Sequence, residues 1–313
     1  MRLGLDIGGT KTDAVVLDAR GGVRASVRVP TGIGPAAVLD SAERSVRAVI
    51  EQAGTGLVAA ETIGVGIPGM VDPDSGRVRH AVNLGVEELS LGAELSFRVG
   101  VPVRVENDVK AASLGTYHLL GLTGSAALLN LGTGMAAGIV VDGELQRGSG
   151  GGAGEIGHIP VDPKGAVCSC GQRGCLETLA SGSGIARMWP SKAALPAVEL
   201  FDAADAGDER ALAVRDTLAA GVASAVRVLV LTVDVQTVVI GGGVSNLGGR
   251  LLSPVLDVLR DWEHDSAFLR SLDVADRVRM LPAGLPAAAV GAALIGTTGA
   301  PEPGGVGLPV PQD

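Results

Sequence analysis

The chain has 313 residues, of which 46% are hydrophobic and only 2% aromatic, and its formal net charge is −9. This length allows two domains with a substantial core, and the composition is that of a globular protein rather than a disordered one. The acidic balance, without a basic stripe carrying interleaved aromatics, argues against a nucleic-acid or anionic-membrane surface. With so few aromatics, Val, Leu, Ala and Ile must build the core.

The chain has no pattern of a secretory signal, because Asp6 interrupts the opening MRLGLDIGGT. Residues 111–141 and 280–301 lack Asp, Glu, Lys and Arg, but repeated Gly and Pro turn signals break both stretches. They are therefore expected to be buried structure and not membrane spans. Three cysteines without a secretory signal favour a reducing cytoplasm.

Strands and helices are expected to alternate along the chain. Strands at residues 3–7 and 12–17 flank a Gly8-Gly9 turn typical of a hairpin tip. Apolar and polar residues alternate at 23–29, which predicts a half-buried strand. At 36–53 apolar residues recur on one helical face, which predicts an amphipathic helix. Further strands are expected at 63–67, 101–105, 126–131, 137–141 and 236–240, and further helices at 108–120, 209–233, 251–260 and 287–295. This alternation predicts the α/β fold class.

Residues 3–17 and 126–141 share one layout, a strand, a turn of Gly and Thr, and a second strand. This weak internal repeat suggests two related halves. Residues 299–313 are rich in Pro and Gly and are expected to be a disordered tail.

Three glycine-rich turns follow expected strands, in LDIGGTKT (5–12), LNLGTGMAAG (129–138) and VVIGGGVSN (238–246). Glycine lets backbone N–H groups approach an anion closely, and Thr10 and Lys11 add further donors. Asp6 could hold Mg²⁺ through water. A single Gly-Gly turn is equally well an ordinary hairpin, but three of them at strand ends indicate a nucleotide cleft.

The stretch VENDVKAASLG (105–115) places acidic and amide side chains where a strand meets a helix. Asp108 has two interpretations at this position. It could be the N-cap of the helix, or a general base that takes the proton of a substrate hydroxyl. Asn107 beside it would hydrogen-bond sugar hydroxyls.

All three cysteines, Cys168, Cys170 and Cys175, follow His158 within one short stretch. A histidine with three thiolates is a closed tetrahedral zinc set, so the metal would be structural and not hydrolytic. A disulfide is the main alternative, but it leaves one cysteine over and needs an oxidising compartment. A reactive thiol is a weaker alternative, because no paired base is evident.

Six motifs in one order carry a resemblance to a known family. They are DIGGTK (6–11), ENDVKAA (106–112), NLGTG (130–134), GGGAGEIGH (150–158), CSCGQRGCLE (168–177) and IGGGVS (240–245). Over roughly residues 1–297 the chain resembles the ROK family (repressor, open reading frame, kinase), especially its bacterial glucokinase and N-acetylhexosamine kinase branch.

The resemblance implies a two-domain, actin-like (ribonuclease H-like) α/β fold with ATP and a sugar in the interdomain cleft. The expected smaller domain is residues 1–110 with the C-terminal helix at about 287–298. The larger domain, residues 111–286, would carry the zinc-binding loop. The implied activity is ATP- and Mg²⁺-dependent phosphorylation of a hexose at its 6-hydroxyl in the cytoplasm, by a homodimer or homotetramer.

The resemblance also assigns roles to matching residues. Asp108 matches the catalytic base, and the implied sugar ligands or neighbours are Gly69, Asn83, Asn107, Asp108, Glu155, His158 and Glu177. The implied nucleotide, phosphate and Mg²⁺ positions are Asp6, Gly8, Gly9, Thr10, Lys11, Gly132, Thr133, Gly134, Gly241, Gly242 and Gly243. The implied structural zinc ligands are His158, Cys168, Cys170 and Cys175.

The sequence departs from the family pattern at Lys110, at Thr116 and at Gly85-Val86, which leaves the identity of the sugar open. Glucose is the expected substrate, with an N-acetylglucosamine, N-acetylmannosamine or other hexose kinase as the alternative. A repressor of the same family would carry a helix-turn-helix before the DIGGT motif, where only five residues stand here. A sugar sensor without catalysis and a polyphosphate-using kinase are further alternatives.

Overall fold

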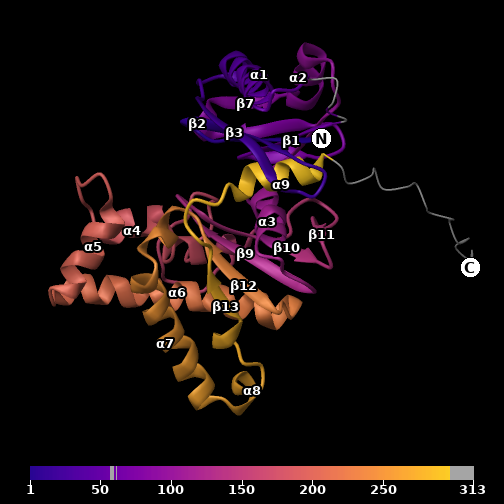
Figure 1. Cartoon of the computed structure of the whole chain (residues 1–313). Helices are drawn as coiled ribbons and strands as arrows, with labels where there is room; N and C mark the ends of the chain where they lie inside the picture. The colour runs from indigo at the N-terminus through magenta and orange to yellow at the C-terminus, as the bar shows by residue number, and fades with distance from the viewer. Residues whose placement is uncertain (57–59, 61, 297–313) are drawn as a thin grey trace, which may run out of the picture.

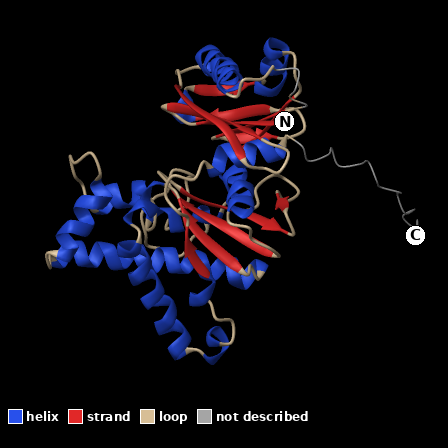
Figure 2. Ribbon diagram, in the orientation of Figure 1, coloured by secondary structure: helices blue, strands red, loops and turns tan. Residues whose placement is uncertain are grey.

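The structure is a computed structural model that describes residues 1–56, 60 and 62–296. Two five-stranded sheets and one small three-stranded sheet form its framework, with helices packed around them (Figures 1 and 2). The tail expected at 299–313 and the end of the helix expected to reach about 298 lie outside the described residues.

The first sheet has the strand order β3-β2-β1-β4-β8. β1, β2 and β3 form an antiparallel meander, and β4 and β8 continue from β1 in parallel. The strands are β1 (Arg2–Ile7), β2 (Lys11–Leu17), β3 (Val23–Pro30), β4 (Ile63–Ile67) and β8 (Val103–Asn107). Helices α1 (Pro35–Gln52) and α2 (Leu91–Val99) share its hydrophobic core.

The second sheet repeats this arrangement in the order β11-β10-β9-β12-β13. Its first three strands are antiparallel, and β12 and β13 follow β9 in parallel. The strands are β9 (Ser125–Leu131), β10 (Met135–Val141), β11 (Glu144–Gln146), β12 (Thr237–Gly241) and β13 (Val278–Met280). The two halves suggested by the repeated hairpin are therefore confirmed as two sheets of the same topology.

The larger share of the helices belongs to the second sheet. They are α4 (Gly182–Met188), α5 (Pro196–Asp205), α6 (Glu209–Val233), α7 (Gly249–Asp265) and α8 (Ala267–Arg270). Apart from the short exposed α8, they bury their apolar faces in one core with β9, β10 and β12. By length and composition α6 could cross a membrane, a test that buried core helices also pass, and half of its apolar window is buried inside this protein.

Helices α3 (Asp108–Leu119) and α9 (Ala287–Ile295) cross between the two sheets (Figure 1). α9 packs on β1, β2 and β4, whereas α3 packs on β10. The helices meet at Gly115 and Gly291, where a Cβ on either glycine would overlap backbone atoms of the other helix. Glycine is needed here because only it allows two helix backbones to approach so closely.

Most predicted elements are present, with shifted bounds at several ends. The strand expected at 101–105 lies at Val103–Asn107, two residues later, and therefore ends directly at the start of α3. The helix expected at 251–260 is α7, which is longer than expected at both ends, and a 3₁₀ turn, η5 (Gly243–Leu247), precedes it. Sequence reasoning missed α2, α4, α5, α8, β11 and β13. It also missed the three-stranded antiparallel sheet of β5 (Met70–Asp72), β6 (Arg77–Ala81) and β7 (Val86–Leu89).

Candidate active site

A polar cavity of about 660 Å³ lies where the ends of the two sheets face each other. Parallel strands end at one edge, so Asp6, Gly66 and Glu106 are neighbours in register on the first sheet. On the second sheet Gly241 is paired with Asn130 in the same way. Ligands of α/β sheets bind outside the carboxyl ends of parallel strands, and this cavity lies at such an edge in both sheets.

The cavity gathers every expected sugar residue. Its lining includes Gly69, Asn83, Asn107, Asp108, Glu155, His158 and Glu177, and also the turn of Gly132, Thr133 and Gly134. Asp6, the Gly8–Lys11 turn and the turn of Gly241, Gly242 and Gly243 are not among its lining residues. The structure therefore brings the residues expected to bind the sugar to one cavity, whereas of the three turns expected at the nucleotide only Gly132–Gly134 lines it.

The start of α3 fixes the Asn107-Asp108 pair. Asn107 is the N-cap, because its Oδ1 accepts hydrogen bonds from the N–H groups of Val109 at 3.0 Å and Lys110 at 3.2 Å. The interpretation of Asp108 as the N-cap is therefore wrong, and Asp108 is the first residue of the helix. Asn107 also donates from Nδ2 to the Gly69 carbonyl at 3.3 Å, which ties the cap to a second part of the cavity wall.

The Asp108 carboxylate has a raised pKa. Burial among protein atoms is the largest cause, and the hydrogen bond from the Val109 N–H, at 2.9 Å, opposes it. The negative charge of Glu155 raises the pKa further. A carboxylate with a raised pKa accepts a proton more readily, which suits a general base.

Asp6 is a second acidic group at this edge. Burial, followed by the charges of Asp108 and Asp13, raises its pKa to about 7, and Lys11 acts in the opposite direction. Two carboxylates that repel each other in a buried setting are a donor set that a divalent cation would stabilise. Oxygen ligands of this kind fit Mg²⁺.

Glu155 and His158 sit on a short turn that is pressed against β10. The turn η3 (Ile156–His158) is held by a hydrogen bond from the Ala137 N–H to the Gly154 carbonyl, at 2.8 Å. A Cβ at Gly154 or Gly157 would overlap the backbone of β10. Gly154 and Gly157 are thus required for close packing on β10, and this packing sets where Glu155 and His158 stand.

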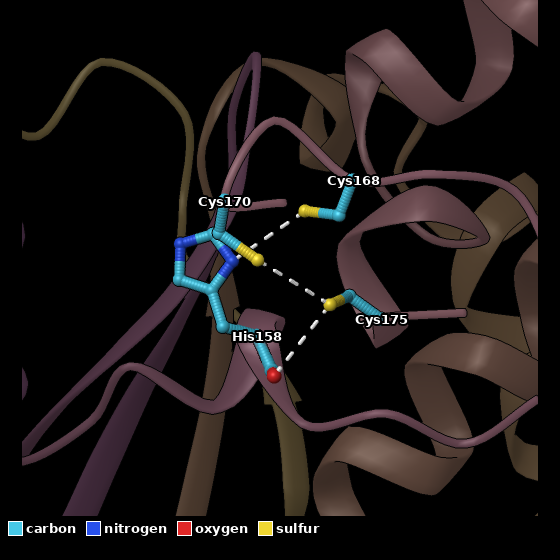
Figure 3. Close-up of side chains that lie close together, drawn as sticks. All are labelled: His158, Cys168, Cys170 and Cys175. Atoms are coloured by element: carbon cyan, nitrogen blue, oxygen red, sulfur yellow. Dashed lines mark hydrogen bonds between the residues drawn. The ribbon is translucent and has the colours of Figure 1, made fainter. Parts of the chain in front are cut away.

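His158 and the three cysteines converge from two segments of one loop (Figure 3). One ligand atom from each lies within 4.8 Å of all the others. Cys170 Sγ and Cys175 Sγ are 3.7 Å apart, and Cys168 Sγ is 3.6 Å from His158 Nδ1. Sulfurs bound tetrahedrally to zinc at ~2.3 Å would be ~3.8 Å apart, so the set fits this metal. All three cysteines are free thiols, and the disulfide alternative is wrong.

Glu177 joins this cluster to the cavity. Its Oε2 accepts a hydrogen bond from the Met135 N–H at 3.1 Å, directly after the Gly132–Gly134 turn. Its Oε1 lies 3.5 Å from both Cys168 Sγ and Ser169 Oγ. One carboxylate thus bridges the cysteine loop and a turn expected to face the nucleotide.

Several lining residues escaped sequence reasoning. Met70, Val71 and His80 come from the missed three-stranded sheet, and Lys110 was noted only as a departure. His80 has a positive φ of 55°, and no pattern in the sequence predicts this left-handed backbone conformation. The three strands are too short for periodicity to detect, so their contribution could not be found from the sequence.

Two sheets of one topology around a shared polar cavity define a two-domain α/β protein. Residues 2–296 match the family model described as the ROK family, and the chain belongs to this family. The chain is 35% identical over 274 residues to the glucokinase of Halalkalibacterium halodurans, covering 81% of this chain and 83% of that one. It is 34% identical over 260 residues to the N-acetylmannosamine kinase of Citrobacter koseri, covering 80% and 85%.

Solved structures agree with this assignment. The ROK hexokinase from Thermus thermophilus has a TM-score of 0.78 at 32% identity, covering 94% of this chain and 97% of that one. A ROK family glucokinase from Streptomyces griseus, in complex with glucose and AMPPNP, has a TM-score of 0.75 at 30% identity, covering 94% and 98%. The expected resemblance and the actin-like two-domain fold are thereby confirmed.

Proposed function

We propose that this protein is an ATP- and Mg²⁺-dependent hexose kinase that phosphorylates the 6-hydroxyl of its sugar, with glucose as the preferred substrate. The observation that carries the proposal is the position of Asp108. Its carboxylate has a raised pKa and lies in a cavity whose lining also includes Asn83, Glu155, His158 and Glu177. Glucokinases and a hexokinase among the relatives support the same activity.

In this mechanism Asp108 accepts the proton of the sugar hydroxyl as that oxygen attacks the γ-phosphorus of ATP. The bond between the γ-phosphorus and the β,γ-bridging oxygen breaks, and ADP leaves. Phosphoryl transfer needs little more from the protein than positioning and charge neutralisation. Carboxylate and amide groups of Asn83, Glu155 and Glu177 are suited to hold the remaining sugar hydroxyls. They act as acceptors and donors that keep the attacking oxygen in line.

The glycine turns serve the nucleotide. The Gly8 and Gly132 N–H groups donate to the Lys11 and Gly134 carbonyls and close the two turns. Other backbone N–H groups of these turns are suited to donate to phosphate oxygens, and Lys11 adds a cation. The turn of Gly241–Gly243 would contact the nucleotide from β12. Asp6 would hold Mg²⁺ through water, and the ion would neutralise charge on the phosphates.

We further propose that His158, Cys168, Cys170 and Cys175 hold a structural zinc ion. Four protein ligands leave no open position, so the ion would crosslink the loop and take no part in phosphoryl transfer. The link through Glu177 to the Met135 N–H would transmit the order of the loop to the cavity.

The division into residues 1–110 with the C-terminal helix, and 111–286, also stays a proposal. It is supported by the separate cores of the two sheets and by the packing of α9 on β1 and β4. A cytoplasmic homodimer or homotetramer is proposed by analogy with soluble kinases.

An N-acetylmannosamine kinase is the second candidate, because a relative of that name matches the chain almost as well as the glucokinases do. A coupled ADP-release assay with Mg²⁺ tests both. The panel is glucose, N-acetylglucosamine, N-acetylmannosamine, mannose, fructose and allose. We expect glucose to give the highest kcat/KM, and the kinase proposal is wrong when no sugar of the panel releases ADP.

A further inference from the structure

Glu106 and Lys110 flank the Asn107-Asp108 pair, and both are buried. The exposed fraction is 3% for Glu106 and 6% for Lys110. Among the residues that the structure describes, no other Asp, Glu, Lys or Arg has so small an exposed fraction. Buried charges are costly unless they are paired or hydrogen-bonded, so each must have a compensating partner. Neither has a role in the mechanism above.

Both side chains reach one segment, residues 147–152, which follows the last strand of the β9–β10–β11 meander. Glu106 Oε2 accepts from Arg147 Nε at 2.6 Å, and Glu106 Oε1 accepts from the Asn107 N–H at 3.0 Å. Lys110, in the first turn of α3, donates from Nζ to the carbonyl of Gly151. Charge-assisted bonds such as these are stronger than neutral ones.

The segment they hold, residues 147–152, has almost no side chains with which to pack. We call it the glycine loop, and its sequence is RGSGGG. A Cβ built at Gly150, Gly151 or Gly152 would meet nothing within 4 Å, and Ser149 is exposed. Local backbone bonds, such as Ala153 N–H to the Arg147 carbonyl at 3.1 Å, shape the loop but do not anchor it to α3.

The glycine loop forms part of the cavity wall and leads directly into Glu155. Gly150, Gly151 and Gly152 line the cavity together with Lys110. Its backbone continues through Ala153 and Gly154 to the turn that carries Glu155 and His158. A shift of the loop would therefore change the distance between Glu155 and Asp108.

We propose that Lys110 and Arg147 are positioning residues of this site. They fasten the glycine loop on both sides of the Asn107-Asp108 pair and so fix the spacing between Asp108 and Glu155 to which the hexose binds. The inference rests on the proposed hexose kinase function. We call the bonds from Lys110 to Gly151 and from Arg147 to Glu106 the tethers of the glycine loop. The proposal predicts that loss of either tether weakens hexose binding and has much less effect on ATP binding.

The test compares Lys110→Met and Arg147→Met with two control variants. Arg98→Met removes an ion pair of the same 2.6 Å length, to Asp40, from an arginine side chain 31% exposed, against 32% for Arg147. Lys192→Met removes an exposed lysine. We expect the hexose KM to rise about tenfold in either tether variant, the size of effect that loss of one charged hydrogen bond can have. The ATP KM should change less than about threefold, and the controls should match the wild type.

Hydrogen exchange of the free protein supplies a readout that does not depend on activity. Amides of residues 147–156 should exchange faster in the two tether variants, while β1 and α6 stay as in the wild type. Arg147→Lys should recover part of the hexose affinity, because it restores the charge but not the guanidinium geometry.

The outcomes separate the two proposals. The positioning role of Lys110 and Arg147 is wrong if the wild type releases ADP and both folded variants keep the wild-type hexose KM and the wild-type hydrogen exchange of the loop. A wild type that phosphorylates no hexose overturns the kinase function, and the exchange measurement still shows whether the loop is fastened.

Discussion

Asp108 is the residue on which the proposed chemistry depends. Asp108→Asn keeps the shape and an acceptor for the Val109 N–H but cannot take a proton. Removal of a general base costs ~10²–10⁴-fold, so kcat should fall by this factor while hexose still binds. Steady-state kinetics and a hexose titration measure the two effects.

Asn107, the N-cap of α3, should differ from Asp108 in its effect on stability. Asn107→Ala removes an N-cap and should lower the free energy of unfolding by ~1 kcal/mol, whereas Asp108→Asn should leave it unchanged or higher. In the wild type, kcat should fall at low pH because the base works only when deprotonated. The raised pKa of Asp108 should move this fall in kcat to higher pH. A kcat within a factor of two in Asp108→Asn would remove Asp108 from the mechanism.

Asp6 predicts a pH-dependent stability of defined sign. Its folded pKa of about 7 lies above the ordinary value of 3.8, so the folded state binds the extra proton between these values. Stability from this group is therefore present at low pH and lost as the pH rises from about 4 to 7, by at most ~4 kcal/mol.

Asp6→Asn removes the buried charge and should raise Tm at pH 8 in the absence of divalent cations. At pH 5 the carboxyl is neutral in the folded state, but the unfolded state is already ionised and less than about half of the loss has occurred, so the difference in Tm should be smaller than at pH 8. Differential scanning calorimetry at the two pH values measures this. A Tm difference of equal size at pH 5 and pH 8 would show that Asp6 is not the titrating group.

The zinc loop should act on the sugar through Glu177. Cys170→Ser should lower bound zinc and stability, and should raise the hexose KM, while the ATP KM changes much less. The reason is geometric, because the loop orients His158 and Glu177 and a closed zinc site has no ligand position for phosphate. Elemental analysis gives the zinc content, and kinetics on the folded fraction gives both KM values. An unchanged hexose KM in metal-free wild type would show that zinc stabilises the loop but has no effect on hexose binding.

At the scale of elements, the crossing of α3 and α9 is a contact with no room for an added side chain. Gly291→Ala would place a methyl group on the Ala111 carbonyl and the Gly115 amide, backbone atoms that cannot move aside. Overpacking of this kind costs ~1–3 kcal/mol, and we expect a lower Tm. Gly143→Ala is no suitable control because φ is 85° there, whereas Gly249→Ala has free space and an ordinary φ. Equal Tm values for the two variants would contradict the close crossing.

The sequence predicted elements best where a local signal marks their ends. α6 has the predicted bounds, because Asp208 caps its start and accepts from the Ala211 N–H. α9 has the bounds predicted at 287–295, and β1 and β2 each begin one residue before the predicted start. The strands β5, β6 and β7 were missed because three to five residues carry no clear period.

In the site, the motifs identified the side chains but not their partners. Asn107 and Asp108 are adjacent and both are good caps, so only the backbone of α3 shows which one caps the helix. The bonds from Glu106 to Arg147 and from Lys110 to Gly151 join residues 41 apart in the chain. No local pattern reports such contacts, because they depend on how the two halves dock.

At the scale of the whole molecule, both halves line the cavity, but each half also has a glycine turn that lies outside it. The Gly8–Lys11 turn and the Gly241–Gly243 turn, both expected at the nucleotide, do not line the cavity where the residues expected to bind the sugar lie. Since phosphoryl transfer needs the γ-phosphate beside the sugar hydroxyl, the two halves should move closer together when both ligands bind. The narrow crossing of α3 and α9 is suited to act as the pivot, because it joins the separate cores of the two sheets.

Small-angle scattering tests this closure. A compact chain of 313 residues has a radius of gyration of about 20 Å, and a two-lobed protein with an open cleft exceeds that value. We expect the radius to fall toward it when glucose and a non-hydrolysable ATP analogue are added together, with a smaller change for either ligand alone. Asp108→Asn should close in the same way, because it keeps the hydrogen-bonding shape of the site. A radius that stays constant with both ligands bound would mean that the cleft already has its working geometry, and that the two glycine turns reach the nucleotide without movement of the halves.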